Sequence, residues 1–223
     1  YSLDKKEYPE IKNLHIFTIG RSVVPFAWNP FRGPPGIDFR VWLNAIFETL
    51  EKSSMSGQGV SFVLTKYYEK KFKEMGFGTI EPKQYPNFFD GLNELESEKN
   101  RSYAREREWK QSAIRILKSF TFGPHSISFN SRNPICLEDF LDKPIIFELD
   151  QELPKPIRVF FMELLLRWIH LYRLSQGEKN NLNHILILEE SSNIFPKNKY
   201  EKELTNNLET VFREIRSFGQ GLI

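Results

Sequence analysis

The chain has 223 residues, of which 40% are hydrophobic and 27% are charged, and its formal net charge is +2 at pH 7. This balance is ordinary for a globular protein and excludes a polycation, so contact with nucleic acid requires a local patch. The single cysteine, Cys136, excludes an internal disulfide framework and a cysteine-based zinc site, and it favours a reducing compartment, so we expect a cytoplasmic protein.

The first half of the chain predicts one strand followed by several helices. Residues 14–20 alternate between apolar and polar side chains, which predicts a strand, and a loop rich in proline and glycine follows. Asp38 is typical of an N-cap, and apolar residues recur at helical spacing after it. Further helices are expected at about 60–76, 88–98 and 100–121.

After residue 122 the pattern changes to an alternation of strands and helices. The expected order is strand 125–130, short helix 136–142, strand 143–150, helix 155–175, strand 183–190, helix 200–218 and the start of a strand at 219–223. The long helix is apolar almost all round and should be buried, but it carries too many charges to cross a bilayer. The alternation predicts parallel strands joined by crossover helices.

The sequence therefore predicts an α/β fold with a parallel-sheet core and a mostly helical inserted subdomain. The helical block is too long for a simple connection within one sheet. We expect residues 1–37 to begin the core, residues 38–122 to form the insertion, and residues 123–223 to complete the core.

Two adjacent glutamates, Glu189 and Glu190, end the aliphatic run "HILILEE". Ligands of open parallel sheets bind beyond the carboxyl ends of the strands, where this pair is expected. An aliphatic strand ending in two acids is the Walker B pattern of P-loop NTPases, in which one acid supports Mg²⁺ and the other polarises water. The alternative is a strand end whose glutamates only face solvent.

Four segments occur in an order that resembles one family. They are "FTIGRSVVPFAWNPFRGPPGID", "LDKPIIFELD", "ILILEESSNIF" and "FREIRSFGQGLI". This succession resembles the HerA/FtsK superfamily of hexameric DNA-pumping ATPases, particularly HerA and its conjugation-type relatives, over nearly the whole chain. The fold implied is a RecA/FtsK-like P-loop NTPase core, incomplete in these residues.

The resemblance implies a role for three residues. Glu189 matches the first Walker B acid, which supports Mg²⁺ directly or through water, and Glu190 matches the catalytic glutamate. Arg216 matches an arginine finger that reaches the nucleotide of a neighbouring subunit, for which the planar guanidinium fork is suited. Ser191 and Ser192 depart from the Ala-His that the family often has there.

For the whole protein, the resemblance implies an ATP hydrolase that uses ATP and Mg²⁺, acts on DNA as a translocase or helicase, and forms a homohexamer. A partner nuclease, or components of a secretion or conjugation system, are implied as partners. The resemblance does not decide between DNA end processing, conjugation and defence. The DNA-contacting residues stay unassigned.

No G-x-x-x-x-G-K-[ST] motif occurs in the 223 residues. In the resembled family this loop precedes the second core strand, so we expect it upstream of Tyr1. The apolar last residues and the absence of an initiator methionine also suggest a segment of a longer chain. As given, the 223 residues are not expected to hydrolyse ATP alone.

Other interpretations stay open at this point. The chain can be an ATPase-like module that binds proteins without turnover, or an unrelated α/β protein. Arg213 and Arg216 can simply offset the dipole at a helix C-terminus. The basic run 99–118 can contact phosphates or form a solvated helix face. The four histidines have no metal-ligand spacing, and the aromatic residues of the proline-rich loop are expected to pack rather than to stack on bases.

Overall fold

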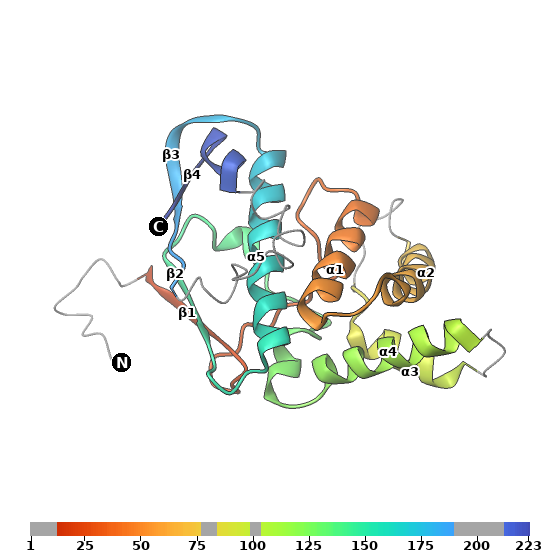
Figure 1. Ribbon diagram of the computed structural model, residues 1–223. Coiled ribbons are helices and arrows are strands. Elements are labelled where there is room, and N and C mark those ends of the chain that lie inside the picture. Colours follow the sequence, from red (N-terminus) through yellow and green to blue (C-terminus); the bar gives the residue numbers. More distant parts are fainter. Residues whose placement is uncertain (1–12, 77–83, 99–103, 190–211) are drawn as a thin grey trace.

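The computed structural model describes residues 13–76, 84–98, 104–189 and 212–223 (Figure 1). Its strands form two parallel pairs. Strand β1 (His15–Ile19) pairs with β2 (Ile145–Leu149) along its whole length. Strand β3 (Lys179–Leu186) pairs with β4 (Phe218–Leu222), with an irregularity in β3 between Lys179 and His184. The expected parallel pairing is confirmed in both pairs, but the pairs are separate two-stranded sheets, and β3 lies four residues earlier than the strand expected at 183–190.

Helix α5 (Lys155–Ser175) is the central element of the fold. In Figure 1 the strands lie on one side of this helix and the other long helices lie on the opposite side. Its side chains are buried on most of its circumference, since Phe161 contacts Phe147 of β2 while Trp168 donates a hydrogen bond from Nε1 to Arg32 O, at 3.1 Å. The apolar sequence of the helix is therefore explained by neighbours on both sides.

The helical block consists of α1 (Phe39–Ser54), α2 (Gln58–Glu74), α3 (Phe88–Ser97) and α4 (Ala104–Thr121). Helix α1 packs directly on α5, and the buried residues of all four helices belong to the same hydrophobic core as α5. The predicted helices are thus confirmed, with their ends shifted by a few residues. The division of the chain at residues 38 and 122 stays a prediction.

Asp38 caps α1, as its position in the sequence predicts. Its Oδ1 accepts a hydrogen bond of 2.8 Å from the backbone N–H of Arg40, which satisfies one of the unpaired donors of the first turn. We expect Asp38→Ala to lower the free energy of unfolding by about 1 kcal/mol. Urea unfolding monitored by circular dichroism measures this. Asp38→Asn keeps an acceptor oxygen and should unfold near the wild-type midpoint; equal losses for both variants would show that the cap does not contribute.

The proline-rich loop between β1 and α1 is part of the core. Phe26, Trp28 and Phe31 are almost completely buried, and the Phe31 ring stacks on Tyr68 with 4.2 Å between centroids. The expectation that these aromatic residues pack in the interior is confirmed. They join the loop to the helical block.

The prediction of a strand at 125–130 is wrong. Residues Pro124–Ser128 form a short 3₁₀-helix, η2. Gly123 has a φ of 82° and Pro124 starts the turn, so the chain coils where alternation alone predicts extension. Asn130 stabilises the coil by donating hydrogen bonds of 2.9 Å to the carbonyls of Phe120 and Ser126. The short helix expected at 136–142 is a 3₁₀-helix, η3, at Leu137–Asp139.

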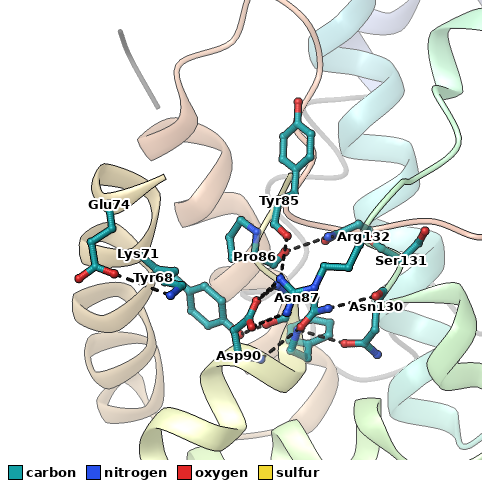
Figure 2. Close-up of polar contacts among 12 residues, drawn as sticks. Tyr68, Lys71, Glu74, Tyr85, Pro86, Asn87, Asp90, Asn130, Ser131 and Arg132 are labelled. Atoms are coloured by element: carbon teal, nitrogen blue, oxygen red, sulfur yellow. Dashed lines mark hydrogen bonds and ion pairs between the residues drawn. The ribbon is translucent and has the colours of Figure 1, made fainter. Parts of the chain in front are cut away.

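Figure 2 shows the polar network that attaches α3 to the segment before β2. Asn87 and Asp90 form a capping box at the start of α3, and the guanidinium of Arg132 binds both carboxylate oxygens of Asp90 at 2.8 and 2.6 Å. The Asn87 amide also donates to Asn130 O at 3.1 Å. These bonds link the start of α3 to residues 130–132.

Candidate functional site

Glu189 lies just beyond the carboxyl end of β3. Leu186 and Leu188 pack toward Leu166 of α5, whereas Ile185 is exposed on the other face. The parallel pairing continues past the strand, because the N–H of Leu188 donates to Ile223 O at 3.0 Å. The Glu189 side chain is exposed in the turn that follows. A carboxylate at this edge of a parallel sheet is placed where such sheets bind ligands.

Glu190, the expected catalytic glutamate, lies outside the described residues. Its role, and its proximity to Glu189, therefore stay predictions. Most of the helix expected at 200–218 also lies outside them; its described end is the turn η5 (Ile215–Ser217), and β4 follows at once.

Arg216 is exposed in η5, immediately before β4. Strands β3 and β4 are parallel, with Lys179 opposite Phe218 and Leu186 opposite Leu222. Arg216 is therefore at the amino end of the pair, and Glu189 is at the carboxyl end. With a rise of about 3.3 Å per residue, the two positions are roughly 20 Å apart. Within one chain they do not belong to one site.

The carboxyl ends of β1 and β2 are joined by an ion pair. Arg21 Nε lies 2.6 Å from Asp150 Oδ2, and this hydrogen bond lowers the pKa of the Asp150 carboxyl. Gly20 allows the approach, because its φ is 98° and a Cβ atom there would lie 3.0 Å from Asp150 Cβ. Gly20 and Arg21 thus hold the carboxyl end of β1 next to the carboxyl end of β2.

Glu189 supplies one exposed carboxylate at this edge of the sheet. Among the described residues, no group of three or more His, Cys, Asp or Glu side chains is placed to hold a metal ion. Mg²⁺ commonly takes one or two carboxylates and completes its shell with water and phosphate oxygens. The Glu189 carboxylate is one ligand of that kind.

Two separate polar contacts join histidines to the segment that contains η5 and β4. His170 of α5 is 8% exposed, and its Nε2 lies 3.5 Å from Glu214 Oε2. The side-chain amide of Gln220 donates to His184 Nδ1 at 3.0 Å. Sequence patterns did not indicate these contacts, and His170 gives no distinctive local signal because α5 also buries Glu163 and Arg167.

Burial favours the neutral form of both imidazoles. Burial lowers the pKa of His170 from 6.5, while the Glu214 carboxylate acts to raise it. Burial also lowers the pKa of His184, which Arg173 lowers further and Asp142 opposes. As the pH falls below 6.5 the unfolded chain binds protons before the folded chain does, so acidification removes the stability that the neutral imidazoles contribute.

We expect Glu214→Gln to lower the pKa of His170 further, because the substitution removes the carboxylate that favours the imidazolium. Histidine ring chemical shifts followed by NMR across pH measure the change. Glu178→Gln, the same change at an exposed glutamate immediately before β3, is the control and should leave the pKa of His170 at its wild-type value. An unchanged or raised pKa of His170 would contradict the contact.

The basic run on α4 is partly neutralised by acids. Lys110 is buried and lies 3.1 Å from Glu98 Oε2, while Lys118 lies 2.8 Å from Glu96 Oε1. Arg105 lies over the Trp109 ring at 5.2 Å. Contact of this helix with DNA stays a prediction. No helix in the described ranges is both long and apolar enough to cross a membrane.

The fold is similar to those of VirB4 and the bacterial conjugative coupling protein TrwB. VirB4 of Thermoanaerobacter pseudethanolicus matches with a TM-score of 0.63 at 13% identity, over 98% of this chain and 82% of VirB4. The unbound bacterial conjugative coupling protein TrwB matches with a TM-score of 0.62 at 11% identity, over 95% of this chain and 50% of TrwB. TrwB in complex with ADP and Mg²⁺ matches with a TM-score of 0.56, at 11% identity and over 95% of this chain.

These similarities confirm at the level of the fold the HerA/FtsK-type resemblance of the sequence. The chain spans about half the length of the TrwB structures and most of VirB4. No protein-family model matches the sequence, and no curated protein matches it. At this level of identity the comparisons show the fold alone.

Proposed function

We propose that this chain is part of an ATP-driven DNA translocase or helicase that works as a hexameric ring. Glu190 would orient and deprotonate the attacking water, Glu189 would support Mg²⁺, and Arg216 would complete the site of a neighbouring subunit. The structural neighbour TrwB is described as a plasmid coupling protein and has been observed with ADP and Mg²⁺. Transport of DNA by this protein is inferred from that similarity and from the sequence motifs.

The observation that carries this proposal is the position of Glu189 at the carboxyl end of a parallel strand pair. A carboxylate there can reach a metal ion on the phosphates of a nucleotide bound beyond the strands. When bound, Mg²⁺ would neutralise charge on those phosphates. A neighbouring cation also removes the electrostatic cost of two adjacent carboxylates.

The position of Arg216 supports a finger that acts between subunits. Since Arg216 is at the amino end of the β3–β4 pair, roughly 20 Å from Glu189 by strand rise, it does not reach a nucleotide at its own carboxyl edge. It is exposed, and so it is available to a neighbour. An arginine supplied in trans stabilises the charge that develops on the transferred phosphoryl group.

The experiment that tests the proposal is an ATPase assay of the full-length protein with and without double-stranded DNA. We expect Mg²⁺-dependent hydrolysis that DNA stimulates. Native mass spectrometry with ATP should show a hexamer. Absence of hydrolysis in a folded, nucleotide-binding hexamer would contradict the proposal.

A second candidate is an ATPase-like assembly module that does not turn over ATP. It is favoured by the absence of a G-x-x-x-x-G-K-[ST] loop from the 223 residues and by the serines that follow the two glutamates. Isothermal titration of the full-length protein with ATP and Mg²⁺ separates the two candidates, because a module without a phosphate-binding loop should show no binding.

A further inference from the structure

His170 contacts the chain on both sides of Arg216. Its Nε2 lies 3.5 Å from the Glu214 carboxylate, two residues before the arginine. Its ring meets the ring of Phe218, two residues after the arginine, with 5.9 Å between centroids and an interplanar angle of 77°. A single side chain of α5 therefore spans the base of the turn that presents Arg216 to solvent.

Among the described residues, β3, β4 and the buried side chain of Ile215 also support this turn. Helix η5 has only three residues, and a 3₁₀ turn of this length has weak hydrogen bonds of its own. Ile215 is 4% exposed and anchors the turn in the interior, while Gln220 is held by His184 further along β4. The Arg216 side chain is long and flexible, so its direction depends on how firmly its backbone is held.

The buried face of His170 is suited to hold this turn. The side chain is 8% exposed, and no described residue hydrogen-bonds to its Nδ1. Its polar contact among the described residues is therefore the one with Glu214, whose side chain is 49% exposed. An apolar side chain would fill the same space, so the imidazole is not required for packing alone.

We propose that His170 is a positioning residue for Arg216, which holds η5 through Glu214 and Phe218 so that the guanidinium points toward the neighbouring subunit's nucleotide. This inference rests on the proposed function, in which Arg216 acts as a finger in trans. His170 itself touches no nucleotide. A displacement of a catalytic group by about 1 Å lowers rates by up to about 100-fold, so a loosened turn should be visible in turnover.

The test is a double-mutant experiment in the full-length protein. His170→Phe keeps a ring against Phe218 and removes the partner of Glu214. We expect kcat for ATP to fall by about 10- to 100-fold with the nucleotide Kd unchanged, since only the alignment of the finger is lost. In an Arg216→Ala background, His170→Phe should lower kcat no further, because no finger remains to be positioned. His125→Phe is the matched control and should change neither quantity.

Two further measurements keep the outcomes distinct. Glu214→Ala releases the same contact from a half-exposed position, so it tests the inference even if His170→Phe does not fold. Thermal unfolding of each variant identifies a general loss of structure. An equal fall of kcat in the wild-type and Arg216→Ala backgrounds would overturn the positioning role, as would unchanged kcat in both His170→Phe and Glu214→Ala.

The Arg216, His170 and Glu214 variants distinguish a failure of this inference from a failure of the proposed function. If Arg216→Ala lowers turnover while the His170 and Glu214 variants do not, only the positioning role is wrong. If Arg216→Ala itself leaves turnover unchanged, the finger assignment is wrong and the positioning role falls with it.

Discussion

Replacing Glu190 by glutamine is expected to lower ATP turnover by roughly 10²- to 10⁴-fold while nucleotide binding is retained. Glutamine has nearly the same shape as glutamate, but its amide does not accept a proton from the attacking water. The effect should therefore fall on kcat and leave the Kd for ATP close to the wild-type value. Steady-state hydrolysis and titration calorimetry of the full-length protein measure the two quantities separately.

The matched control for this experiment is Glu178→Gln, the same change on an exposed glutamate immediately before β3. It should hydrolyse ATP like the wild-type protein. Glu189→Gln should instead weaken the Mg²⁺ dependence of nucleotide binding, because that carboxylate supports the metal in the proposed site. Unchanged hydrolysis by the Glu190→Gln protein would remove the catalytic assignment.

Replacing Arg216 by alanine is expected to lower turnover by at least about 10³-fold, the effect typical of a lost arginine finger. The guanidinium would act on a neighbour's nucleotide, so a variant subunit should also disable the site next to it. In rings mixed with wild-type subunits, hydrolysis should therefore fall more steeply than the fraction of wild-type protein. Mixing the two proteins at several ratios before assembly measures this dependence.

Arg213→Ala provides the control for Arg216→Ala, because both arginines are exposed and lie close together in the chain. If the two arginines only offset a helix dipole, the substitutions should have similar and small effects, below about 1 kcal/mol on stability. If Arg216 is the finger, Arg213→Ala should leave turnover near the wild-type value. Activity that scales simply with the wild-type fraction in mixed rings would count against action in trans.

Local sequence patterns predicted most of the secondary structure because the helices and strands here are consistent with their own periodicity. The N-cap at Asp38 marks the start of α1, and the aliphatic run at Ile145 marks β2. The pattern failed at Pro124–Ser128, where alternation predicted a strand. A glycine with positive φ and the hydrogen bonds of Asn130 decided that segment, and the latter come from side-chain geometry that alternation does not encode.

The sequence by itself determined most of the helices and the parallel arrangement implied by the alternation of strands and helices. Only the tertiary structure decided that Arg216 and Glu189 lie at opposite ends of one strand pair, because the register between β3 and β4 is set by packing between distant segments. It also brought His170 against Glu214 and Phe218. Such contacts depend on how α5 crosses the sheet, which no short stretch of sequence specifies.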